Sequence, residues 1–363
     1  MDIEGELKVK LVVLAGGLAA LFTLIGTPLL INFLHKRGIA QAIRESTEDV
    51  LYPEHGSKRG TPSMGGVAIV ISVILAYFLA HLIVWRPPTV SGYLAIYLMV
   101  SLSLVGVADD YLKIFKQRST GIRARTKLLG QAVAAVSFGY LATRFPDESG
   151  KLPISNAISW VRDTRLVLPG AVILIWIWFL ITGITNGTNL TDGLDGLATG
   201  AALVSFTAYT IMCIWQYGQS CFWGEFARCY TVRDPLDLAV FAAACAGASF
   251  GFLWWNASPA RIFMGDTGSL ALGGALAALA LMTRTELLLG LIGGLFVIIT
   301  LSVIAQVGSY KLTGKRVLRM APLHHHFEMK GWPEVQIVVR FWIIQGLCVG
   351  AGMAMFYAEW VRQ

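Results

Sequence analysis

The stretch GGVAIVISVILAYFLAHLIV, residues 65–84, contains no lysine, arginine, aspartate or glutamate. Roughly 17–25 predominantly apolar residues cross the hydrocarbon core of a bilayer as one helix. Nine similar blocks lie at residues 11–34, 92–108, 128–142, 166–184, 197–215, 238–255, 270–282, 287–307 and 337–356. Because backbone groups in lipid must hydrogen-bond to one another, each block is expected to be helical. The sequence therefore predicts an all-α polytopic membrane protein with about ten transmembrane helices in a single domain, residues 1–363.

The composition agrees with a membrane protein. Of the 363 residues, 55% are hydrophobic and 14% are charged, whereas soluble domains carry about 25% charged residues. The net charge of +7 comes without a basic stripe interleaved with aromatic residues, so no nucleic-acid partner is expected. The eighth block, 270–282, is short and rich in glycine and alanine, so it either spans with help from its neighbours or forms a re-entrant pair.

The loops between the blocks differ in their content of lysine and arginine. Loops 35–62, 113–127, 185–193, 256–267 and 311–336 carry 17 of these residues, and the remaining loops and termini carry 11. Because positively charged loops tend to stay in the cytoplasm, the first set is predicted to be cytoplasmic and both termini extracytoplasmic. Cys221 and Cys229 then share a loop in an oxidising compartment, where we expect them to form a disulfide.

Two adjacent carboxylates, Asp109 and Asp110, close the third block, and Lys113 follows one turn later. Carboxylates at membrane depth are costly and usually face a cavity or a charged partner. The simpler alternative is a helix end at the interface, where one carboxylate pairs with Lys113. An adjacent pair favours a functional site.

Two further polar segments lie in predicted cytoplasmic loops. Asn186–Leu197 is dense in Asn, Asp and Gly, so it either lines a ligand site or forms a polar turn with helix caps. Asn256–Ser269 contains Asp266, which can coordinate a hard cation, since Mg²⁺ typically uses one or two carboxylates plus substrate phosphates. Phe263 either stacks on a base or anchors this loop in the interface.

The last predicted cytoplasmic loop contains three consecutive histidines, His324–His326. Because consecutive side chains point in different directions, phosphate binding or substrate positioning fits them better than one shared metal ion; an exposed loop with chance histidines is the alternative. Lys58, among basic, glycine and proline residues, suits either a phosphate clamp or a positively charged cytoplasmic loop. Carboxylates, lysines and asparagine on one face are typical of Mg²⁺-assisted phosphoryl transfer, so the active site is expected on the cytoplasmic face.

At these residues the chain resembles the polyprenyl-phosphate hexosamine-1-phosphate transferases over nearly its whole length. The resemblance rests on Ala108-Asp-Asp-Tyr-Leu-Lys113, Asn189-Leu-Thr-Asp-Gly-Leu-Asp-Gly-Leu-Ala198 and Phe263-Met-Gly-Asp-Thr-Gly-Ser269. Pro322-Leu-His-His-His-Phe-Glu328 resembles the phospho-N-acetylmuramoyl-pentapeptide-transferase branch of this family in particular. Ser63 stands where the family usually has threonine, and residues 217–236 show no family signature.

The resemblance implies that undecaprenyl phosphate attacks the β-phosphate of UDP-MurNAc-pentapeptide, which gives lipid I and UMP in peptidoglycan biosynthesis. It implies Mg²⁺ as the cofactor, a membrane lipid as the acceptor, and the bacterial inner (cytoplasmic) membrane as the location. The oligomeric state stays open, with a homodimer as one option.

The resemblance also implies roles for the matching residues. Asp266 holds Mg²⁺ with help from Asn189, Asp109 activates the lipid phosphate, and Asp110 orients the metal or Lys113. Candidates for the uridine side are Asp192, Asp195, Asn256 and Phe263, and candidates that hold phosphates or the donor sugar are Lys58, Lys113, Lys127, His324, His325 and His326. The three aspartates and the three histidines form the expected catalytic set.

Two alternatives belong to other classes. A transporter or flippase would use intramembrane carboxylates as a proton relay, but here the charges gather at one face and no inverted repeat is visible. A sister transferase with a different sugar nucleotide is disfavoured by the histidine motif.

Overall fold

Ten long helices form the body of the protein in a computed structural model that describes residues 3–37, 60–115, 121–221 and 229–362. They are α1 (Ile3–Lys36), α2 (Gly66–Val84), α3 (Val90–Phe115), α4 (Ala124–Ala142), α5 (Gly170–Thr191), α6 (Leu197–Gly218), α7 (Pro235–Asn256), α8 (Gly265–Met282), α10 (Gly294–Thr313) and α12 (Glu334–Arg362). Within the described residues, nine of these are long and apolar enough to cross a membrane. The tenth, α4, is less apolar because Arg125 and Lys127 lie in its first turn.

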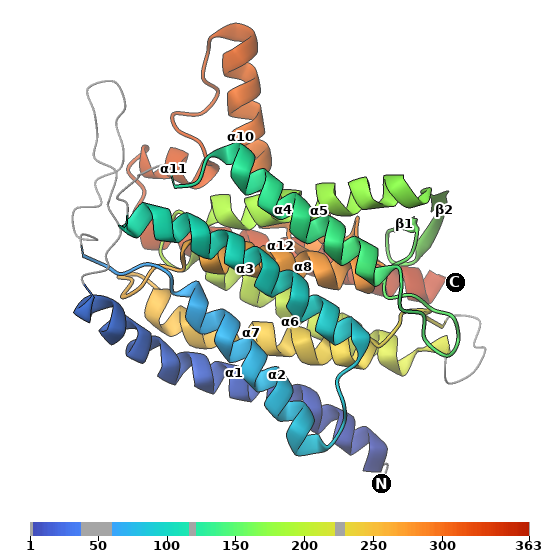
Figure 1. Cartoon of the computed structure of the whole chain (residues 1–363). Coiled ribbons are helices and arrows are strands. Elements are labelled where there is room, and N and C mark those ends of the chain that lie inside the picture. The colour runs from blue at the N-terminus through green and yellow to red at the C-terminus, as the bar shows by residue number, and fades with distance from the viewer. Residues whose placement is uncertain (1–2, 38–59, 116–120, 222–228, 363) are drawn as a thin grey trace.

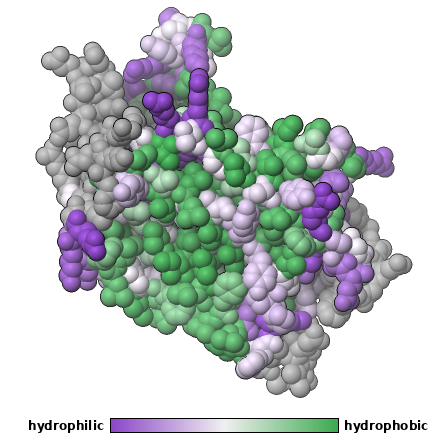
Figure 2. Space-filling view, viewed as in Figure 1, coloured by the Kyte–Doolittle hydropathy of each residue, from purple (hydrophilic) through white to green (hydrophobic). Residues whose placement is uncertain are grey.

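The helices run roughly side by side, and their lipid-facing residues form a broad hydrophobic surface. Figure 2 shows this surface across the middle of the bundle, with hydrophilic residues toward its two ends. The prediction of a polytopic helical membrane protein is therefore confirmed.

Helix α8 lies at the centre of the bundle and settles the uncertain eighth block as one continuous helix. Almost all of its residues are buried by the surrounding helices, among them α3 and α5. Glycines allow these close contacts: a Cβ on Gly273 would lie 2.6 Å from the Cα atom of Thr185 in α5. Because α8 contacts protein rather than lipid, it can carry fewer large apolar residues than its neighbours.

The structure differs from the prediction at the ninth block, before α5 and in the histidine loop. The ninth block is interrupted at Gly293, so the short helix α9 (Leu289–Ile292) precedes α10, which projects away from the other helices (Figure 1). The loop before α5 contains an antiparallel hairpin of β1 (Ala157–Ser159) and β2 (Asp163–Val167), so the fold is not entirely α-helical. The histidine loop contains the short helix α11 (Leu323–Glu328).

The two ends of the bundle differ in what they carry. The start of α1, the end of α12 and the hairpin lie at one end, whereas α11 lies at the other (Figure 1). Both termini therefore lie on the same side, as the ten predicted membrane-spanning blocks require. Cys221 and Cys229 form a disulfide, which confirms that expectation.

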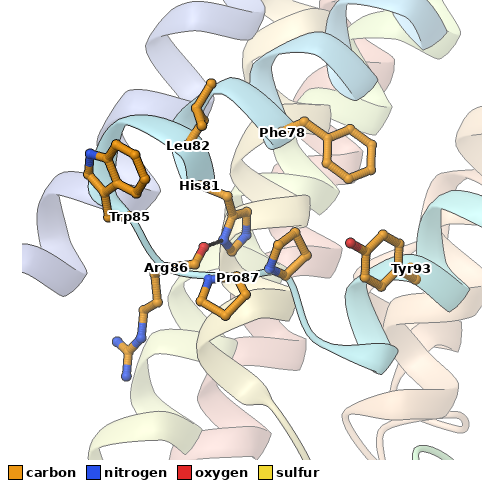
Figure 3. Close-up of a pocket in the computed structure, with 8 residues that line it drawn as sticks. Phe78, His81, Leu82, Trp85, Arg86, Pro87 and Tyr93 are labelled. Atoms are coloured by element: carbon orange, nitrogen blue, oxygen red, sulfur yellow. Dashed lines mark hydrogen bonds between the residues drawn. The ribbon is translucent and has the colours of Figure 1, made fainter.

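At the end that carries the termini, Asp237 of α7 binds the turn between α2 and α3 through hydrogen bonds. Its carboxylate accepts hydrogen bonds from the Tyr77 hydroxyl (2.8 Å) and from the amide (2.7 Å) and hydroxyl (2.6 Å) of Thr89. His81 bridges Asp237 (Nε2–Oδ1 2.9 Å) and the carbonyl oxygen of Arg86 (Nδ1–O 2.7 Å). Beside His81 lies an apolar surface pocket lined by residues that include Phe78, Trp85, Pro87 and Tyr93 (Figure 3).

We predict that Glu286 makes stability pH-dependent. Burial raises the pKa of Glu286 to about 8, although the Ser159 amide donates to it at 2.5 Å. The folded state therefore favours the protonated carboxyl, and the stability this confers is lost as pH rises from about 4.5 through about 8. Between pH 6 and pH 8 the free energy of unfolding should fall by ~2–3 kcal/mol. Thermal unfolding of detergent-solubilised Glu286→Gln protein should show a slope smaller by this amount, while Asp192, whose pKa is also raised to about 8, keeps its own contribution. An equal slope in both proteins contradicts the assignment.

We also predict that both termini face away from the cytoplasm. A reporter enzyme that is active only outside the cytoplasmic membrane should be active when it is fused to the C-terminus. The matched control is the same reporter inserted after Lys315, in the connection between α10 and α11 at the opposite end of the bundle. Activity of the Lys315 insertion and silence of the C-terminal fusion would reverse the orientation.

Candidate active site

Three aspartates from two helices meet at the end of the bundle opposite the termini. Asp109 and Asp110 lie in the last turns of α3, and Asp266 lies in the first turn of α8. One oxygen from each carboxylate falls within a group no more than 4.8 Å across. The expectation that Asp266 lies in a loop is wrong, because α8 begins at Gly265, whose φ of +74° lets the chain turn directly into the helix.

Two lysines surround Asp266. The Nζ atom of Lys113 lies 2.9 Å from Asp266 Oδ1 and 2.5 Å from Asp109 Oδ2. Lys127 of α4 forms an ion pair with Asp266 Oδ2, and its Nζ atom also donates to Asn189 Oδ1 at 3.3 Å. Both lysines are largely buried, so each ammonium compensates carboxylate charge that water does not reach.

Asp109 is enclosed by the chain that enters α4. Its Oδ1 atom accepts a hydrogen bond from the Ile122 amide at 2.7 Å. The preceding residue, Gly121, has a φ of +59°, and a Cβ there would lie 2.5 Å from the same oxygen. Glycine therefore allows the backbone to close over the carboxylate.

Asn189 and Asp192 line the same site from the end of α5. The Asn189 amide group donates to Ser269 Oγ at 2.9 Å, which fixes its carbonyl oxygen toward Lys127. Burial raises the pKa of Asp192 to about 8, and the nearby carboxylates of Asp266 and Asp110 raise it further. With Asp192 the cluster holds four carboxyl groups and two lysines.

Asp195 and Asn256 hold the segment that leads to Phe263. Asp195 accepts from the Ala260 amide at 3.1 Å, and buried Asn256 donates to the Ile262 carbonyl at 3.0 Å. Phe263 itself is half-buried, and its amide donates to the carbonyl of Pro62 at 2.9 Å. The segment before α2 is thereby joined to the start of α8, while Lys58 lies outside the described residues.

Two of the three histidines lie together: the rings of His324 and His325 meet edge to face with centroids 4.3 Å apart, whereas His326 is held separately. His324 is fully buried with no hydrogen-bond partner for either ring nitrogen among the described residues, and burial holds its pKa well below its usual range. His325 pairs with Glu328 (Nδ1–Oε2 2.5 Å), and His326 accepts from the Arg319 amide at 3.0 Å. His324 faces Gly193, where a Cβ would collide with its Nε2 atom.

Sequence reasoning overlooked two residues that bind these segments together. Glu334, at the start of α12, accepts from the Asp195 amide at 2.8 Å, and no local pattern around it signals this contact. The Thr267 hydroxyl donates to Asp110 at 2.6 Å. The position of Thr267 next to Asp266 in the sequence is the signal that could have identified it as part of the site.

Comparison with known proteins identifies the family. The family model described as Glycosyl transferase family 4 matches residues 92–284, and the phospho-N-acetylmuramoyl-pentapeptide-transferase signature 1 matches residues 58–70. Curated phospho-N-acetylmuramoyl-pentapeptide-transferases are similar over almost their full length. The protein of Streptomyces avermitilis is 54% identical, with 98% of this chain and 99% of the relative covered. Those of Streptomyces griseus and Kineococcus radiotolerans are 53% and 55% identical, each with 97% of this chain and 99% of the relative covered.

The matched regions contain much of the site described above. The family model spans the three aspartates and both lysines, and the signature covers the segment that joins Phe263 through Pro62. Identity above 50% over nearly the whole length extends this match to α11 and α12. The chain therefore belongs to the phospho-N-acetylmuramoyl-pentapeptide-transferases of glycosyl transferase family 4.

Proposed function

We propose that the protein transfers phospho-MurNAc-pentapeptide from UDP-MurNAc-pentapeptide to undecaprenyl phosphate, which gives lipid I and UMP. The observation that carries the proposal is the cluster of Asp109, Asp266, Lys113 and Lys127 at one end of a membrane-spanning bundle. Such a site can receive a lipid phosphate from the bilayer and a nucleotide from the aqueous side. The names of the relatives give the transferred group, phospho-N-acetylmuramoyl-pentapeptide, and the family resemblance implies the nucleotide donor and the lipid phosphate acceptor.

The donor set suits Mg²⁺ as the cofactor. Asp109, Asp110 and Asp266 carry three negative charges when ionised, and the two lysines compensate only two of them; Asp192, with its pKa raised to about 8, adds a fourth charge only at higher pH. Oxygen ligands and excess negative charge favour a hard divalent cation. Asp266 would hold the ion with the side-chain oxygen of Asn189. The bound ion would neutralise charge on the diphosphate and on the departing UMP.

The lysines and Asp109 would handle the phosphate groups. Lys113 and Lys127 place two ammonium groups beside Asp266, where they can hold the donor diphosphate as their carboxylate partners shift. Asp109 shares Lys113 with Asp266 and would orient the lipid phosphate for attack on the β-phosphate. The lipid phosphate is largely ionised near neutral pH, so this attack does not require a strong general base.

The remaining residues would bind the rest of the donor. Asp195 and Asn256 bind the segment between α7 and α8 that contains Phe263, and these three residues with Asp192 are the candidates for the uridine. Lys58 and the three histidines are the candidates for the phosphates and the sugar; neutral His324 can donate or accept a hydrogen bond there.

The proposed location is the bacterial cytoplasmic membrane, with the site on the cytoplasmic face. Loops at the site's end carry the excess of lysine and arginine. The Cys221–Cys229 disulfide lies in a loop at the opposite end, which suits an oxidising exterior.

The direct test is UMP release by the purified protein with Mg²⁺, polyprenyl phosphate and labelled donor. We expect release with UDP-MurNAc-pentapeptide and at least ~100-fold less with UDP-N-acetylglucosamine, because missing donor groups cost transition-state binding. A preference for UDP-N-acetylglucosamine would point to a sister transferase. Solute uptake into vesicles without UMP release would point to a transporter.

Asp266→Asn and Asp109→Asn should both lower turnover, but with different dependence on Mg²⁺. Asp266→Asn removes the charge proposed to hold the ion, so turnover should fall by roughly 10²–10³-fold and half-saturation should need more Mg²⁺. Asp109→Asn should leave half-saturating Mg²⁺ near the wild-type value, because that residue acts on the lipid phosphate. Wild-type turnover of Asp266→Asn at low Mg²⁺ would exclude Asp266 as the metal ligand.

A further inference from the structure

The first turn of α8 has no capping side chain of its own. Met264 occupies the N-cap position and forms no side-chain hydrogen bond there. The cap comes instead from α3: the amides of Asp266 and Thr267 donate to Asp110 Oδ1 (3.0 Å) and Oδ2 (2.9 Å). The Thr267 hydroxyl also donates to Oδ2 at 2.6 Å. One carboxylate of α3 thus satisfies two of the amides that a helix start leaves without partners.

These bonds use most of the capacity of the Asp110 carboxylate. A carboxylate offers about four acceptor positions, and the three donors of α8 fill three of them. Asp110 is 3% exposed, so water does not compete for this carboxylate. Asp109 and Asp266 differ from it, because each is also bound by a lysine ammonium group on a flexible side chain, although Asp109 accepts one backbone amide, that of Ile122, as well. Asp110 is held by parts of α8 that cannot leave it without moving the helix.

Close packing on either side fixes where α8 begins relative to α3. A Cβ on Gly265 would lie 2.6 Å from Asp110 Oδ2 and 3.0 Å from the Ser63 hydroxyl oxygen. One turn earlier in α3, a Cβ on Gly106 would collide with the carbonyl oxygen of Asp266. Two contacts one turn apart therefore set the register of the two helices. The side chain of Asp266 is carried by this same turn.

We propose that Asp110 is a positioning residue that acts through Asp266 rather than a ligand of the metal. Its cap holds the first turn of α8 against α3, so that the Asp266 carboxylate stays between Lys113 and Lys127. This role rests on the proposed function in one respect: the Asp266 carboxylate is taken to participate in the transfer reaction. Small displacements of reacting groups are costly, so a weaker cap should lower turnover without removing any group that contacts substrate.

The sharpest variant is Thr267→Val, because it removes one donor of the cap and leaves all three aspartates in place. Thr267 is fully buried, and valine replaces its hydroxyl by a methyl group of similar size, so the change removes one hydrogen bond without opening a cavity. We expect kcat to fall roughly 5–50-fold with half-saturating Mg²⁺ unchanged, since a hydrogen bond to a charged group is lost. The matched control is Thr267→Ser, which keeps the hydroxyl and should retain kcat within about threefold.

Asp110→Asn completes a double-mutant cycle. Its amide group cannot accept from both Asp266 and Thr267, so kcat should fall further than in Thr267→Val, again with unchanged Mg²⁺ dependence. Because both variants weaken one cap, the double variant should be little slower than Asp110→Asn alone. Full additivity, wild-type kcat in Thr267→Val, or a more than fivefold rise in half-saturating Mg²⁺ for Asp110→Asn would each overturn the proposal.

A readout without turnover separates this proposal from the proposed function. Hydrogen exchange of the peptide that contains Asp266 and Thr267 should be slow in the wild-type protein and in Thr267→Ser. It should be faster in Asp110→Asn by at least about tenfold, because asparagine keeps only one of the two oxygens and one of the two amides loses its acceptor. Equal exchange in wild type and Asp110→Asn rejects the cap. Absence of UMP release from the wild-type protein rejects the proposed function, and the exchange result still decides the cap.

Discussion

The carboxylate of Asp266 lies at a buried helix start only because two ammonium groups from other helices face it. A carboxylate without a partner at this depth would cost several kcal/mol. Lys113 reaches it from α3 and Lys127 from α4, so the charge is balanced only when α3, α4 and α8 are assembled. The site and the packing of these helices therefore depend on one another, and neither lysine could be replaced by an apolar residue without leaving charge uncompensated.

The composition of α8 follows from this position. A helix that carries the site at its start and is enclosed on all sides needs small residues where its neighbours approach. Gly268 meets Gly66 of α2 and Gly273 meets α5, and both contacts leave no room for a Cβ. The mean hydropathy of α8, 1.3, is below that of α2, 2.7, which contacts lipid. The low hydropathy of α8 therefore reflects its central, enclosed position, and it does not argue against α8 as a membrane-spanning helix.

Much of this could be predicted from the sequence, because the hydrophobic blocks and the polar motifs are both local patterns. Each of the ten blocks corresponds to a long helix, apart from the break at Gly293. Local patterns give no information about caps supplied from elsewhere in the chain. The apolar block begins only at residue 270, so the sequence places Asp266 in a loop, and only the position of Asp110 shows that the helix begins earlier. The cap is formed between residues 156 positions apart, so no spacing rule reveals it.

The hairpin before α5 was missed for a related reason. Residues 163–167 read Asp-Thr-Arg-Leu-Val, which lacks the alternation of apolar and polar residues by which a strand is recognised, and 166–167 fall within the fifth predicted block. Pairing with residues 157–159, which rest against Glu286, holds the strand in place. The histidine motif shows the opposite limit: its importance is visible in the sequence, but adjacent letters do not show that His324 turns inward while His326 stays near the surface.

Comparison of the two ends of the bundle suggests how structural and reactive carboxylates differ in this protein. Asp237 accepts hydrogen bonds from an amide and from two hydroxyl groups besides its contact with His81, and these donors belong to packed helices or a tight turn. Asp266 has two lysine side chains as partners. Donors fixed in the backbone hold a carboxylate in one arrangement, whereas lysines on flexible stems can exchange it for a phosphate at little cost in packing. By this criterion Asp110 resembles Asp237 more than it resembles Asp109, although it adjoins Asp109 in sequence. The motif Asp109–Asp110 thus joins one carboxylate that faces the reaction with one that holds the helix beside it.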